Sequence, residues 1–121
     1  MKLMEAIARV DSLKPNTYPT EQKLLWLAQL EAMVKTLVVG IQGEDPAFPE
    51  INENTDPQFR LYMPAPFDMA YLYWLEAQIH YANEEPELYN NAMLLFNAAF
   101  AQFRIHHHQN HSSGTLGRFR F

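Results

Sequence analysis

The chain has 121 residues, enough for one domain that buries roughly two thirds of the surface its unfolded chain exposes. It contains no cysteine, which excludes a disulfide framework, a thiolate nucleophile and any cysteine-ligated metal site. The net charge is −5, and all 14 acidic residues lie at or before Glu87. An acidic body therefore precedes a weakly basic C-terminal segment, which argues against a protein that grips nucleic-acid phosphates.

The first residues, MKLMEAIARVDSL, carry charges where a signal peptide needs an unbroken apolar segment. No apolar run approaches the roughly 20 residues of a membrane-spanning helix. We therefore expect a soluble protein that is not exported by this route. Within the same segment, Leu3, Ile7 and Val10 recur at helical spacing and predict a short helix over 2–13, which Pro15 ends.

Residues 19–39 predict a longer helix that begins at Pro19 and ends at Gly40. Its expected buried stripe consists of Leu24, Leu27, Leu30, Val34, Leu37 and Val38, and its expected solvent-exposed face of Glu21, Gln29, Glu31 and Lys35. The β-branched pair Val38–Val39 leaves the geometry of the last turn open.

Residues 41–66 hold five prolines and five acidic residues without a helical period, which predicts a long loop. Within it, the segment 60–63 (RLYM) is compatible with a short strand. The acidic residues of this loop are Glu44, Asp45, Glu50, Glu53 and Asp56.

Residues 67–106 predict a helical hairpin. Asp68 suits the N-cap of a third helix that ends near 81–83, with Asn83 in a left-handed conformation, and Pro86 suits the first position of a fourth helix over about 86–106. The short connection makes the two helices antiparallel neighbours. The expected inward face of the fourth helix is Leu88, Ala92, Leu95, Phe96, Ala99 and Phe103.

The predicted fold is all-α: a small bundle of about four helices that includes the C-terminal antiparallel hairpin. A helical domain over 1–108 carries the long acidic loop 41–66, and residues 109–121 form an extended C-terminal arm. This arm either stays disordered or docks its end on a neighbouring molecule. The candidate docking residues are Leu116, Arg118, Phe119, Arg120 and Phe121.

Catalytic and metal-binding patterns are weak. The serines Ser12, Ser112 and Ser113 lie outside any G-x-S-x-G elbow, and no phosphate-binding or dinucleotide-binding glycine motif occurs. We expect no enzyme, no cofactor and no metal site. Two groups of residues could form a metal or pH-sensitive site rather than an ordinary polar surface. One is Glu76, His80 and Glu84 at helical spacing, and the other is the histidines 106–108 with His111, whose role the sequence leaves undecided.

The aromatic residues of the hairpin have two interpretations, a core with scattered surface tyrosines or a subunit interface. Tyrosine and tryptophan are enriched at interfaces because they combine a large buried area with a polar group. The apolar surface of the hairpin also exceeds what one small core covers. The candidate interface residues are Tyr71, Tyr73, Trp74, Tyr81, Tyr89 and Phe100.

The segments AIARVDSLKPNTY, EQKLLWLAQLE and YLYWLEAQIHYANEEPELYNNAMLLFNAAFAQF, in this order, resemble the head–tail connector (adaptor) proteins encoded among phage and prophage head genes. The resemblance covers most of residues 5–103. It implies a non-enzymatic virion protein, made in the host bacterial cytoplasm, that forms a ring of commonly twelve copies at the neck of the particle.

The same resemblance implies the partners: other copies of the chain, the portal protein above the ring, a stopper or tail protein below it, and genomic DNA that passes without specific binding. It also implies that the arm engages the portal or a neighbour and that the acidic loop lines the channel, where negative charge would repel DNA and let it slide. The rival interpretation is a small intracellular binding or regulatory module that dimerises through its aromatic face. A third is a metal-dependent hydrolase built on Glu76, His80 and Glu84.

Overall fold

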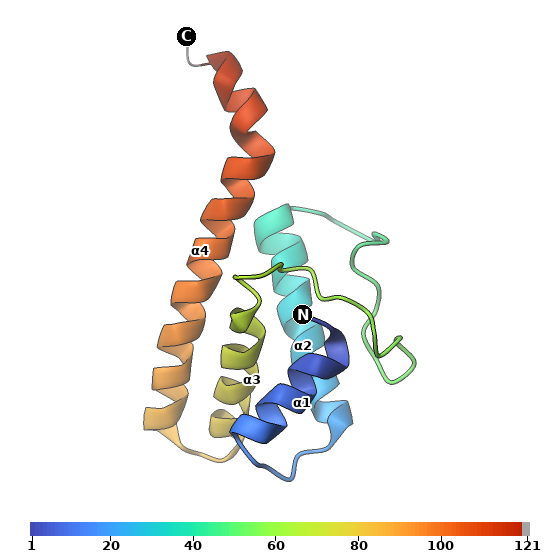
Figure 1. Ribbon diagram of the computed structural model, residues 1–121, viewed down its shortest axis with the longest axis vertical. Coiled ribbons are helices and arrows are strands. Elements are labelled where there is room, and N and C mark those ends of the chain that lie inside the picture. The colour runs from blue at the N-terminus through green and yellow to red at the C-terminus, as the bar shows by residue number, and fades with distance from the viewer. Residues whose placement is uncertain (120–121) are drawn as a thin grey trace.

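The computed structural model describes the backbone of residues 1–119 and the side chains of residues 1–110. Within residues 1–119 the protein is a small all-helical bundle without a β-strand, as predicted (Figure 1). Its elements are α1 (Leu3–Leu13), α2 (Thr20–Met33), the π-helical segment η1 (Val34–Val39), α3 (Met69–Ala82) and α4 (Pro86–Phe119). Figure 1 shows α3 between α4 on one side and α1 and α2 on the other.

Helix α1 confirms its predicted stripe, since Leu3, Ile7 and Val10 are buried together with Ala6. The backbone N–H of Lys2 donates to Oε1 of Glu5 at 3.2 Å, which satisfies one of the amide groups that a helix start leaves unpaired.

The helix predicted over 19–39 is present, but its last part is a π-helix. Gly40 ends it in the left-handed conformation (φ 81°), and its N–H donates to the carbonyl of Lys35, five residues back. The wider turn rotates each residue less around the axis, so Val38 takes the inward position. Leu37 was expected in the core and this prediction is wrong, because the π-turn leaves it 59% exposed.

The loop 41–66 contains no helix, as predicted, and is anchored on the bundle by buried side chains. Ile51, Leu61 and Met63 join the core. The segment 60–63 does not form a strand; a single bridge pairs Arg60 with Lys2. Around it, the N–H of Leu61 donates to the carbonyl of Met1 at 2.9 Å, so the returning loop lies against the start of α1.

The hairpin of α3 and α4 is confirmed, and Pro86 is the first residue of α4. Two details of its ends differ from expectation. Asp68 stands at the N-cap of α3 without a side-chain capping bond, because its carboxylate pairs with the Met1 ammonium at 3.3 Å. Asn83 stays right-handed, and the positive φ of 59° falls on Glu84.

Helix α4 is longer than predicted. The backbone is helical to Phe119, so the extended arm predicted from residue 109 is wrong for 109–119; residues 120–121 lie outside the described part of the chain. The helix continues past 106 because no proline or glycine interrupts residues 87–113. His107 also keeps the inward period of Phe96, Phe100 and Phe103 and is 8% exposed. In Figure 1, α4 rises well beyond the other helices.

Candidate assembly surfaces

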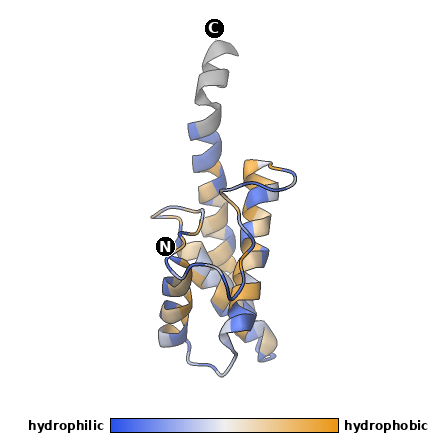
Figure 2. Cartoon of the chain, turned by 90° about the vertical axis from the view of Figure 1, so that its right-hand side faces the viewer, coloured by the Kyte–Doolittle hydropathy of each residue, from blue (hydrophilic) through white to orange (hydrophobic). Residues whose placement is uncertain are grey.

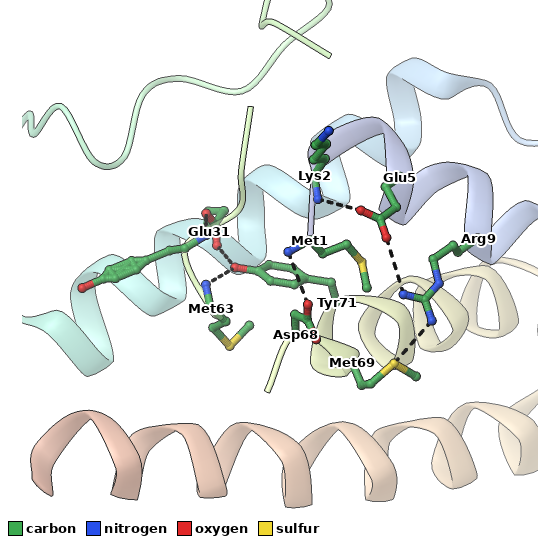
Figure 3. A network of polar contacts seen from close by, with 10 residues as sticks. Met1, Lys2, Glu5, Arg9, Glu31, Met63, Asp68, Met69 and Tyr71 are labelled. Carbon is green, nitrogen blue, oxygen red and sulfur yellow. Dashed lines mark hydrogen bonds and ion pairs between the residues drawn. The ribbon is translucent and has the colours of Figure 1, made fainter. Parts of the chain in front are cut away.

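A buried polar cluster is centred on the carboxylate of Glu31 on α2, which is 5% exposed. Its Oε1 accepts a hydrogen bond from the Tyr71 hydroxyl at 2.5 Å, and its Oε2 accepts from the N–H of Tyr62 at 2.9 Å. The Tyr71 hydroxyl in turn accepts from the N–H of Met63 at 2.9 Å (Figure 3). This cluster joins α2, α3 and the returning loop at one point.

The prediction of a solvent-exposed Glu31 is wrong. A signal in the sequence is its spacing: position 31 lies four residues after Leu27 and three before Val34, both of which are buried. A carboxylate in that position must find donors, because an unpaired buried charge is costly.

Burial raises the pKa of the Glu31 carboxyl above its ordinary value, although the hydrogen bonds from Tyr71 and from the Tyr62 amide oppose the change. The pKa of Tyr71 is raised well above its usual value by burial and by the neighbouring Glu31 carboxylate. Tyr71 is fully buried, whereas Glu31, which is 5% exposed, borders a cavity between α2 and the loop. The arrangement holds the returning loop against α2 and α3.

A second polar cluster ties the α1–α2 connection to the α3–α4 turn. The Tyr18 hydroxyl donates to Oδ1 of Asn83 at 2.6 Å, and the Asn83 amide donates to Oε1 of Glu85 at 3.2 Å. The same Glu85 oxygen lies 2.9 Å from Nδ1 of His80. These contacts, led by the His80 hydrogen bond, lower the pKa of the Glu85 carboxyl.

This cluster replaces the metal site weighed from Glu76, His80 and Glu84. Helix α3 ends at Ala82, and the left-handed Glu84 leaves the helical face that the spacing assumed. His80 is buried against Glu85 instead. In the part of the chain that the structure describes, no three His, Asp or Glu side chains come together as metal ligands would.

The consecutive histidines at the end of the described side chains point in different directions. The ring of His106 lies tilted against that of Phe67 with centroids 4.6 Å apart, His107 packs against Tyr62 and Phe103, and His108 is exposed. Consecutive positions on a helix face different directions, although the rings of His107 and His108 still lie edge to face with centroids 6.2 Å apart. The side chain of His111 lies outside the described residues.

The six candidate interface aromatics separate into core and surface. Tyr71 and Phe100 are buried in the monomer, so their prediction as interface residues is wrong. Tyr73 and Trp74 are half-buried, and the Trp74 indole donates to the carbonyl of Trp26 at 2.8 Å.

The last two aromatic candidates lie at the surface of the α3–α4 turn. Tyr81 is 65% exposed, and its ring lies 5.5 Å from that of the half-buried Tyr89. Because neither ring is enclosed by the core, this pair remains available to a partner.

The outer face of α4 is the largest feature that sequence reasoning missed. Leu88 and Leu95 were predicted to face the core and are 44% and 51% exposed, because the inward positions belong to Ala92, Phe96, Phe100 and Phe103. Leu94 and Ile105 are 69% and 57% exposed. No charged residue occurs between 88 and 103, so this face presents large apolar side chains without a compensating charge.

A second exposed apolar face lies on α2 and η1. Leu25 is 53% exposed and Leu37 59%. Leu25 borders a shallow cavity of about 320 Å³ between α2 and the loop, whose other walls include Phe48 and Ile51. Figure 2 shows the strongly apolar η1 in orange at the upper end of α2.

The acidic loop residues lie at the surface. Glu44, Glu50, Glu53 and Asp56 are exposed and Asp45 is half-buried. Asp45 and Asp56 each accept a hydrogen bond from a backbone amide two residues ahead and so shape the loop locally. The side chains of the candidate docking residues Leu116, Arg118 and Phe119, and the whole of Arg120 and Phe121, lie outside the described part of the chain.

Among the helices described, none combines the length and the apolar character needed to cross a membrane. Comparison with known proteins returns no match, whether with family models, with curated proteins or with solved structures.

Proposed function

We propose that this protein is a non-enzymatic structural subunit that assembles with copies of itself, and that the assembly is the ring of a phage head–tail connector. The observation that carries the assembly is the presence of two different exposed apolar faces, one on α4 around Leu94 and one on α2 and η1 around Leu25 and Leu37. A ring subunit needs two unlike faces because each copy meets its two neighbours through different surfaces.

The assignment of this ring to the neck of a virion rests on the sequence resemblance over residues 5–103. In the proposed ring, commonly of twelve copies, α4 of one subunit packs against α2 and η1 of the next. The portal protein binds above, through the C-terminal residues Leu116–Phe121, and a stopper or tail protein binds below.

The acidic loop supports a channel role. Four of its five acidic side chains are exposed, and negative charge along a channel repels DNA and lets it slide. Neutralising Glu44, Asp45, Glu50, Glu53 and Asp56 together should slow DNA passage and leave ring assembly intact. Unchanged passage would count against this part of the proposal.

The decisive experiment mixes the purified protein with a portal protein from the same genome and images the product by electron microscopy. The expected result is a ring docked on the portal, lost when Leu25→Glu charges one face and retained when the distant exposed Leu13 is changed to glutamate. A protein that binds no portal under any condition would overturn the connector assignment.

A further inference from the structure

The exposed face of α4 has an internal symmetry that points to a particular occupant. Leu94, Ala98, Ala101 and Ile105 are spaced four, three and four residues apart, which places them in one stripe along the helix, and all four are exposed. The stripe lies on the side of α4 opposite Phe96, which enters the core.

The stripe reads the same in both directions: a large side chain, two alanines, a large side chain. The midpoint between Ala98 and Ala101 is also the midpoint between Leu94 and Ile105. A second α4, placed antiparallel about a two-fold axis through that midpoint, therefore sets Leu94 of each copy opposite Ile105 of the other. The alanines then face each other, where small side chains allow the helix axes to approach within about 8 Å.

Charge favours the same occupant. The protein carries a net charge of −5, so most surfaces of two copies repel each other, whereas residues 88–103 are free of charge. Arg104 is the one charged residue between 88 and 105, and it flanks the stripe, where its aliphatic stem can pack beside the partner helix while its charge stays in water.

From this symmetry and this neutrality we propose that free subunits pair through α4 as an antiparallel two-fold dimer centred between Ala98 and Ala101. The stripe from Leu94 to Ile105 is only about 16 Å long. A contact of that size belongs with the small, transient interfaces, so the dimer dissociates on dilution. A two-fold contact is also closed, so it does not grow into larger assemblies.

The first test measures the mass of the purified protein by sedimentation equilibrium over a range of concentrations. We expect a monomer–dimer equilibrium that Leu94→Glu and Ile105→Glu each weaken by about 30-fold or more. Leu37→Glu is the matched control, because Leu37 is similarly exposed but lies on η1, and it should leave the equilibrium unchanged. Circular dichroism checks that each variant keeps its helical content.

The second test determines whether the two α4 helices of the dimer are antiparallel. Because the chain has no native cysteine, only the introduced cysteines can form disulfides. Leu94→Cys mixed with Ile105→Cys should give a disulfide-linked pair on oxidation, while Leu94→Cys alone should give little. A monomer at about 1 mM, a dimer indifferent to Leu94→Glu, or a Leu94→Cys protein that links to itself would each overturn the proposal.

If the proposed connector function also holds, this dimer covers the α4 face that the ring requires. The disulfide-linked pair should then fail to dock on the portal until it is reduced, and docking without reduction would refute this masking. Since the dimer is measured without a portal, failure of the connector assignment and failure of the dimer are separate results.

Discussion

The Tyr71 hydroxyl on α3 donates a hydrogen bond to Oε1 of Glu31 on α2, and the two oxygens lie 2.5 Å apart inside the core. Both side chains are shielded from water. The second bond of that hydroxyl, from the N–H of Met63, extends the contact to the loop. One aromatic hydroxyl therefore links α2, α3 and the returning loop.

Tyr71→Phe should lower the free energy of unfolding by about 1–3 kcal/mol, because it leaves the Met63 amide and one Glu31 oxygen buried without this partner. Urea denaturation followed by circular dichroism measures the change. Tyr81→Phe is the control: that ring is 65% exposed, and its change should stay within about 0.5 kcal/mol. Equal effects of the two variants would contradict the structural role of the buried hydroxyl.

Glu31 should make stability fall as pH rises. Its pKa is raised in the folded protein, so the native state keeps a proton that the unfolded chain loses above the ordinary carboxyl value. The contribution is complete below the unfolded pKa and is lost as pH climbs to the raised one. Glu31→Gln stays neutral at every pH, so denaturation should show no such loss in the variant while the wild type loses stability with rising pH, apart from a constant cost of about 1 kcal/mol for the altered hydrogen bonds.

Glu85 should act in the opposite direction. Its pKa is lowered, chiefly by the hydrogen bond with His80, so its contribution is present above the unfolded carboxyl pKa and is lost as pH falls through the lowered value. In the Glu85→Gln variant, this loss of folding stability at low pH should be absent. Glu84→Gln, one residue away and fully exposed, provides the comparison, and an identical pH profile for the two variants would exclude this role.

The buried Lys23 ammonium pairs with Asp11 at 2.6 Å and is almost enclosed, while Asp11 stays partly exposed. Asp11→Asn removes the opposite charge and should cost about 1–3 kcal/mol. Lys23→Met removes the buried charge itself and should be neutral or stabilising. Thermal unfolding distinguishes the two, and a larger loss for Lys23→Met would mean that the pair is a net source of stability.

Helix positions and the hairpin were predictable because helical spacing and proline placement are local properties. The stripe Leu3, Ile7 and Val10 and the start of α4 at Pro86 needed no knowledge of the rest of the chain. The all-α class follows from the same signals.

The polar details were not predictable because they depend on contacts distant in sequence. Asp68 does not cap α3 because the Met1 ammonium reaches it, and Asn83 stays right-handed while Tyr18 donates to its side chain. The outer face of α4 was missed for a related reason. Leu88 and Leu95 fit a helical stripe as well as Ala92 and Phe96 do, and only the position of α3 decides which stripe is buried.

The π-helical segment Val34–Val39 fixes the direction in which the chain departs toward the acidic loop. The Lys35 carbonyl accepts hydrogen bonds from the N–H groups of both Gly40 and Ile41. The final turn therefore contains one residue more than an α-helical turn would. Deleting a single residue there would restore ordinary winding, swing Leu37 inward and rotate the exit by roughly a quarter turn. Chain length at this joint, rather than its composition, therefore governs where the negatively charged loop is carried.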